Sequence, residues 1–144
     1  MTDDDVRDLV SLVEVAQTDW VHGRFHPLFG LDEGTIFGPF GGPAMGGPGL
    51  GAGQAALAAM FRDGSTEIEA VNTIVSGDIV CLVLVERNQV QFAGEADQRP
   101  WILRTTMLFR RDADGWTLLH RHADPLIERR DLAATRALLP ETLG

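Results

Sequence analysis

The sequence has no tyrosine, one cysteine and few basic residues. The lone Cys81 excludes an internal disulfide and is compatible with a reducing compartment. The chain has 12 basic residues, all of them arginine, against 21 aspartates and glutamates, and the formal net charge is -9 at pH 7. Such a surface repels phosphate backbones and anionic lipid surfaces. We therefore expect neither a nucleic-acid partner nor a membrane partner.

Long apolar runs are also missing. No stretch approaches the roughly 18 residues of a membrane-spanning helix. The acidic segment 1–5 lacks the positive charge and the apolar run of a secretory signal. The glycine-rich segment 38–53 has no G-K-[ST] and therefore no phosphate-binding loop. We expect a soluble cytoplasmic protein without a cofactor.

Periodicity predicts helices before strands. The 144 residues are 44% hydrophobic, which is enough for the core of one domain covering 1–144. Apolar residues at helical spacing predict helices over 4–22 and 54–62. Between them, 38–53 is a loop by composition, either a lid or a plain linker. The tail 129–144 is expected to be exposed, with or without a short helix.

Alternating patterns and turn residues predict strands in the rest of the chain. The expected strands are 35–37, 66–75, 79–90, 101–111 and 116–124. Helices followed by consecutive hairpins indicate an α+β fold with an antiparallel sheet.

The chain resembles the nuclear-transport-factor-2-like superfamily, and in particular its SnoaL-like and ketosteroid-isomerase-like members of uncharacterised function. The resemblance covers about 6–128. It rests on the order of the elements and on these motifs: Gly38-Pro39, Glu86-Arg87, Leu103–Thr106, Phe109–Arg111, Gly115-Trp116 and His120–Leu126. It implies a cystatin-like α+β roll, in which a cone-shaped curved antiparallel sheet packs against N-terminal helices. It also implies a pocket for a small apolar or amphipathic molecule, and a homodimer formed through the other sheet face.

The last expected strand carries the most unusual chemistry. Alternation places His120, His122 and Asp124 on one face and Arg121 on the other, and we expect the histidine row to line the pocket. Histidine titrates near neutral pH and a carboxylate can orient it, so these three residues are candidates for acid/base catalysis, with a histidine as proton carrier. A hydrogen-bonded polar patch is the alternative. Two histidines at i and i+2 could also chelate a metal, but no further His or Cys pattern supports a metal site.

The partners of this row depend on strand register. A plain turn over 112–115 leaves Arg104 and Thr106 on the reverse face. A one-residue bulge at Gly115 would bring both onto the histidine face. Glu86 is expected near Arg104, either as a substrate contact or as a structural ion pair. The expected substrate contacts are Trp20, His26, Glu86, Trp101, Arg104 and Thr106.

The ketosteroid isomerase mechanism does not fit these residues. The chain has no tyrosine to act as oxyanion donor. Gly38 stands before Pro39 where the isomerases place a carboxylate, and Met107 falls near the position of their second carboxyl group. Two hypotheses remain. One is a pocket enzyme for isomerisation, cyclisation or hydrolysis, and the other is a non-catalytic ligand-binding or dimeric interaction module.

Overall fold

A computed structural model of the chain describes residues 1–47 and 49–144; Pro48, within the glycine-rich segment, lies outside the described residues. The elements follow in this order: α1 (Asp3–Val21), the 3-10 helix η1 (Pro27–Gly30), β1 (Thr35–Phe37), β2 (Met45–Gly46), α2 (Leu50–Ala58), β3 (Phe61–Ser76), β4 (Ile79–Phe92), β5 (Arg99–Asp112), β6 (Gly115–Pro125) and α3 (Leu132–Arg136). The expected α+β class is confirmed.

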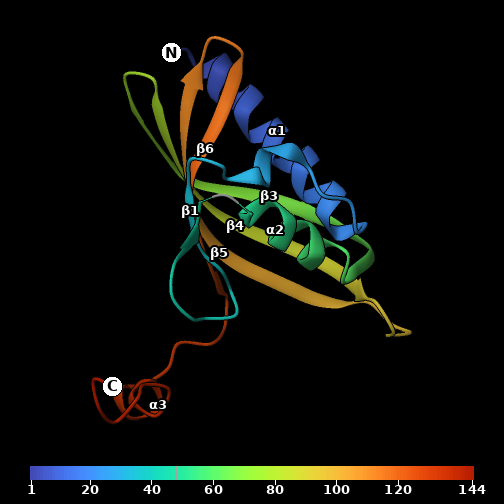
Figure 1. Cartoon of the computed structure of the whole chain (residues 1–144), viewed down its shortest axis with the longest axis vertical. Coiled ribbons are helices and arrows are strands. Elements are labelled where there is room, and N and C mark those ends of the chain that lie inside the picture. Colours follow the sequence, from blue (N-terminus) through green and yellow to red (C-terminus); the bar gives the residue numbers. More distant parts are fainter. Residues whose placement is uncertain (48) are drawn as a thin grey trace.

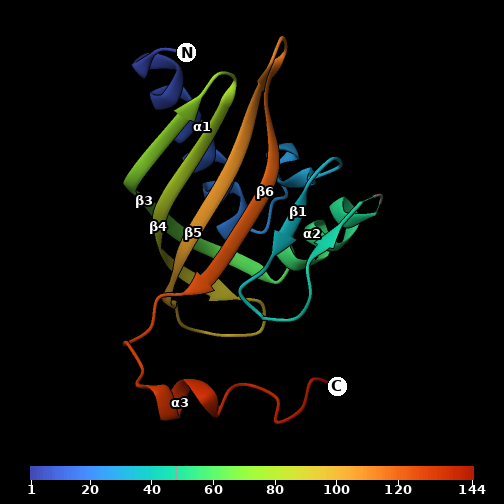
Figure 2. The same cartoon turned by 90° about the vertical axis from the view of Figure 1, so that its left-hand side faces the viewer.

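The described strands form one curved six-stranded sheet in the order β2-β1-β6-β5-β4-β3. Strands β3 to β6 are an antiparallel meander, joined by turns as the sequence predicts. Strand β1 lies between the edge strand β2 and β6, and it pairs with β6 in parallel, with Thr35 opposite His120 and Phe37 opposite His122. Figure 2 shows β1 and β6 lying side by side.

Helices α1 and α2 lie on the same side of the sheet (Figure 1). Helix α1 begins with a capping box, in which Thr2 and Asp5 satisfy each other's backbone N–H groups. Its Leu9 and Val13 are completely buried at helical spacing. They pack in the main core with alternate residues of the sheet: Val80, Leu82, Leu84, Met107 and Phe109. We call the sheet face under these helices the covered face and the other one the open face.

Helix α2 begins and ends earlier than the sequence predicts. It covers Leu50–Ala58 rather than 54–62, and β3 already begins at Phe61. Gly49 precedes the helix with φ of 90°, a left-handed conformation that glycine adopts at little cost. Composition indicated a loop here, but the helix is held by burial of Gln54 and Ala58 beside η1, and packing overrides intrinsic propensity.

A β-bulge in β6 decides which side chains face the helices. Leu118 pairs with Phe109 and His120 pairs with Leu108, so Leu119 has no partner on β5. Of the two alternatives at the turn, the plain one is present, because the hairpin closes regularly there, with Asp112 opposite Gly115, and the bulge occurs at Leu119 instead. Since a bulge shifts the alternation by one residue, Leu118 and Arg121 share the covered face. His120, His122 and Asp124 therefore lie on the open face.

The chain leaves the sheet after Pro125, where β6 ends. The C-terminal segment with α3 extends away from the sheet in both views (Figures 1 and 2). None of the residues of α3 is buried. No helix in the described residues has the length and hydrophobicity to cross a bilayer.

Candidate functional site

A cavity lies on the covered face, between the C-terminal half of α1, α2 and the strands. Its aromatic lining comes from Trp20 of α1, Phe29 of η1, Phe40 after β1, Phe61 of β3 and Trp101 of β5. The space open to the centre of a water-sized sphere is about 60 Å³. A single water needs about 10–15 Å³ on this measure, so the cavity has room for more than one water-sized group.

The aromatic rings hold one another in place. The centroid of Trp20 lies 5.8 Å from that of Phe29 and 6.0 Å from that of Phe61. Trp101 continues the chain of contacts, 6.3 Å from Phe61 and 6.0 Å from Phe40. These separations are typical of favourable edge-to-face and tilted ring pairs. The wall is therefore an apolar surface assembled from five separate segments of the chain.

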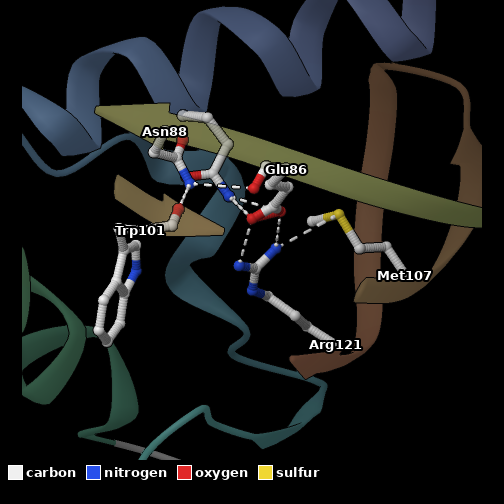
Figure 3. A network of polar contacts seen from close by, with 6 residues as sticks. Glu86, Asn88, Trp101, Met107 and Arg121 are labelled. Carbon is white, nitrogen blue, oxygen red and sulfur yellow. Dashed lines mark hydrogen bonds and ion pairs between the residues drawn. The ribbon is translucent and has the colours of Figure 1, made fainter. Parts of the chain in front are cut away.

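A buried ion pair lies at the polar end of this cavity. Glu86 of β4 is completely buried, and the side chain of Arg121 on β6 is 9% exposed. Both guanidinium nitrogens Nη1 and Nη2 donate to the carboxylate over 2.8 Å (Figure 3). The guanidinium also lies over the Phe29 ring, 5.6 Å from its centroid. The bidentate geometry fixes the pair and cancels its charge.

Gln17 of α1 completes the surroundings of the carboxylate. Its amide nitrogen donates to both oxygens of Glu86, at 2.5 and 2.8 Å. Each oxygen thus accepts from Arg121 and from Gln17. Because buried charge is costly unless paired and hydrogen-bonded, this set of contacts explains how Glu86 is tolerated in the core.

Asn88, two residues further along β4, supplies another polar group to the lining. Its amide nitrogen donates to the backbone carbonyl of Trp101 over 2.8 Å (Figure 3). Asn88 and Glu86 both lie on the covered face, in the alternation that buries Val80, Leu82, Leu84 and Val90. The cavity therefore contains polar groups at defined positions within a mostly apolar lining.

The histidine row lies on the open face, opposite the cavity. His120 Nδ1 is 2.7 Å from the Thr35 hydroxyl. His122 Nε2 is 3.3 Å from an oxygen of Asp124, which also pairs with Arg104 at 3.2 Å. The three candidate catalytic residues do come together, but their expected place in the pocket is wrong, because the bulge at Leu119 turns Arg121 inward instead. Their catalytic role stays a prediction.

The register places Arg104 and Thr106 with the histidines. Arg104 is opposite Asp124 and Thr106 is opposite His122. They contribute to a shallow hollow of the open face, together with Val71, Val83, Val85, His122 and Asp124. The expected pair of Glu86 with Arg104 is wrong. Arg104 is opposite Val85, one residue away in register, and a shift of one residue puts two side chains on opposite faces.

The remaining expected contacts divide between the cavity and its surroundings. Trp20 and Trp101 line the cavity, whereas Glu86 lies behind Arg121 and Gln17. His26 is outside the lining and caps η1, where its Nδ1 accepts from the backbone N–H of Leu28 over 3.0 Å. Among residues 1–47 and 49–144, no three His, Cys, Asp or Glu side chains are grouped to hold a metal ion.

Sequence reasoning missed Arg121, Gln17 and Asn88. A signal was available for Asn88, because strict alternation along β4 puts it on the same face as Glu86 and the buried valines and leucines. For Arg121 the sequence contained no decisive signal, since its face depends on the unpaired Leu119. Gln17 was within the expected helix 4–22, but its partner became evident only from the packing of α1 on β4.

The curved sheet with helices over one face is an α+β roll, and the cavity lies between the helices and the sheet. The chain belongs to the SnoaL-like domain family, whose model matches residues 12–128. No curated protein matches it significantly.

Solved structures show the same fold. A proposed dehydratase of the NTF2-like family from Streptomyces avermitilis is 24% identical, with a TM-score of 0.70 over 88% of this chain and 100% of that chain. An uncharacterised protein with a cystatin-like fold from Caulobacter vibrioides is 16% identical, with a TM-score of 0.61 over 93% of each chain. The association domain of C. elegans CaMKII is 14% identical, with a TM-score of 0.60 over 82% of this chain and 93% of that one. At these identities the likeness establishes the fold alone.

Proposed function

We propose that the protein binds a small, uncharged and mostly apolar molecule in the cavity of the covered face. The observation that carries this proposal is an aromatic lining that ends at a charge-cancelled ion pair, Glu86 with Arg121. Ligand sites are mostly apolar clefts with a few polar groups that fix orientation. Because Glu86 and Arg121 already neutralise each other, a charged ligand would lose its hydration and find no opposite charge left to pair with. A neutral ligand does not have this cost.

Binding is better supported than acid/base catalysis in this cavity. An isomerase, cyclase or hydrolase needs a group free to take up a proton. Glu86 receives hydrogen bonds from Arg121 and Gln17 at both oxygens, and His120 and His122 face away from the cavity. The same point applies to a dehydration of the kind that the name of the Streptomyces avermitilis protein suggests.

The proposal is tested by closing the cavity from its mouth. Gly38 lines the cavity, its φ is outside the left-handed range, and a Cβ added there meets nothing within 4 Å. Gly38→Leu should therefore fold normally and add an isobutyl group at the lining of the cavity. Gly53→Leu is the matched control, since Gly53 of α2 is exposed, equally free of contacts and outside the lining.

Naphthalene is the probe, and its dissociation constant is measured by NMR titration. We expect Gly38→Leu to weaken binding at least about tenfold, which corresponds to 1.4 kcal/mol. Gly53→Leu should stay within about twofold of the unmodified protein. Equal affinity of all three proteins, or no binding of naphthalene by the unmodified protein, would remove the support for a ligand site here.

We also propose that the open face joins two copies of the chain. Three large apolar side chains of the open face are exposed: Phe37 by 40%, Val71 by 58% and Ile74 by 54%. Apolar groups gathered on one uncovered surface are typical of protein interfaces. The Arg104–Asp124 pair beside them would provide polar complementarity across a two-fold axis. The likeness to an association domain is in keeping with self-association.

The mass in solution tests this second proposal. Light scattering should give twice the 15.7 kDa of one chain, and Val71→Glu should shift the mass toward one chain. Leu132→Glu is the control, since Leu132 of α3 is 82% exposed and outside the open face. A monomeric unmodified protein would contradict the proposal, as would a dimer that survives Val71→Glu.

A further inference from the structure

Helix α2 turns its only polar side chain away from solvent. Its sequence is LGAGQAALA, so Gln54 is the one residue of Leu50–Ala58 with a polar side chain. Ala52, Gly53 and Ala56 are exposed, whereas Gln54 is 3% exposed. A surface helix normally presents its polar residues to water and its apolar residues to the core. A polar residue buried against this pattern calls for an explanation.

The Gln54 side chain is part of the cavity lining, as is Leu57 on the same face of α2. Its amide forms no hydrogen bond within residues 1–47 and 49–144, yet it is not one of the fully enclosed groups without a partner, such as Asn88 Oδ1 and the Thr66 hydroxyl. The amide therefore keeps accessible surface. Because Gln54 is almost wholly buried and lines the cavity, a ligand in the cavity can reach this surface.

Both ends of the Gln54 amide are available to one ligand group. Its oxygen accepts hydrogen bonds and its nitrogen donates them. Exchanging the two atoms leaves a donor and an acceptor side by side, so the conclusion does not depend on which way the amide points. The other polar groups of the lining differ in this respect. Gln17 donates through its nitrogen to Glu86, and Arg121 has donors only.

We propose that Gln54 selects ligands that carry a neutral cyclic amide, a lactam, on an otherwise apolar skeleton. A lactam holds its N–H and its carbonyl on the same side, so it can form two parallel hydrogen bonds with the glutamine amide. A ketone, an ether or a lactone only accepts, and leaves the oxygen of Gln54 unpaired. A carboxylate also lacks the donor, and it finds Arg121 already neutralised by Glu86. This proposal rests on the proposed function, because it names the ligand class of the same cavity.

Three probes of similar shape separate these chemistries: 2-quinolinone, coumarin and naphthalene, each titrated by NMR at neutral pH. 2-Quinolinone is a lactam, and coumarin is the lactone in which oxygen replaces its N–H. Both keep the same carbonyl, so a residue that only donates, such as Arg121, does not distinguish them. We expect 2-quinolinone to bind about tenfold tighter than coumarin, because coumarin sets an acceptor against the buried oxygen of Gln54.

Gln54→Met removes the donor and the acceptor and keeps an unbranched side chain of similar length. It should bring the ratio to about one or below, while naphthalene still binds and so shows that the cavity has formed. Gln98→Met is the matched control, since Gln98 is exposed, lies between β4 and β5 and is outside the lining. It should keep the tenfold ratio. A preference that survives Gln54→Met, or that is lost in Gln98→Met, would overturn the role of Gln54.

The lactam preference and the proposed function fail in different ways. If naphthalene binds the unmodified protein but 2-quinolinone is not preferred over coumarin, the role of Gln54 is refuted and the ligand site stands. If none of the three probes binds, the proposed function loses its support. The preference is measured first in the unmodified protein, so the role of Gln54 stays refutable even if Gln54→Met does not fold.

Discussion

The two faces of β6 carry different chemistry within five residues. On the covered face Arg121 is buried, pairs with Glu86 and lines a cavity with aromatic walls. On the open face His120, His122 and Asp124 are partly or largely exposed. His120 contacts Thr35 of β1, His122 contacts Asp124, and Asp124 pairs with Arg104 of β5. The histidines and the aspartate, which stand out most in the sequence, therefore lie on the face that the helices do not cover. Residue type alone does not identify a pocket, because one unpaired residue, Leu119, decides which set faces inward.

The largest expected difference between the faces is in the free energy of unfolding that is lost when an arginine is replaced. Arg121→Met leaves the carboxylate of Glu86 buried without its main partner, and we expect a loss of about 3–5 kcal/mol in the free energy of unfolding. Arg104→Met breaks an ion pair whose side chains are 62% and 45% exposed, and should cost less than about 1 kcal/mol. Urea unfolding at constant m-value measures both.

The double variant Glu86→Leu with Arg121→Met separates pairing from packing. Removing both charges should restore more than half of the lost stability, because the penalty of one unpaired buried charge disappears. Equal losses for Arg121→Met and Arg104→Met would mean that the two faces do not differ in burial as described.

A smaller difference is expected in ligand affinity. Trp101→Ala should weaken naphthalene binding by about tenfold, since a large part of the cavity lining is removed. Trp101→Phe keeps an aromatic ring and should recover most of the affinity. His122→Ala, on the open face, should change the dissociation constant by less than about twofold. A stronger effect of His122→Ala than of Trp101→Ala would place the binding site on the open face.

The smallest expected effect concerns the partly buried carboxylate of Asp112, at the turn between β5 and β6. Hydrogen bonds from Arg110 and then from Thr117 lower the pKa of Asp112 below its usual value. A carboxyl group with a lowered pKa in the folded state stabilises the protein above its unfolded-state pKa, and this contribution is lost as the pH falls through the folded-state pKa. Unfolding at several pH values should show a weaker acid dependence for Asp112→Asn. An unchanged profile would contradict the assignment.

Much of the fold was predictable from sequence, because periodicity and turns are local. The strand 35–37 and the strands of the two later hairpins occur at or near their expected places. The candidate site was predicted less well. Trp20 and Trp101 were expected in the cavity and are there. The partners of Glu86 and the face of the histidines depended on the bulge at Leu119, which no local pattern reveals.

One NMR titration tests the central claim that the ligand site is on the covered face. Naphthalene is added to the isotope-labelled protein, and the indole N–H signals are followed together with the imidazole C–H signals. Trp116 packs against Phe109 outside the cavity lining and serves as an internal reference. We expect saturable shifts for Trp20 and Trp101, with the signals of His120, His122 and Trp116 unchanged. Shifts of His120 and His122 without those of the two tryptophans would contradict it.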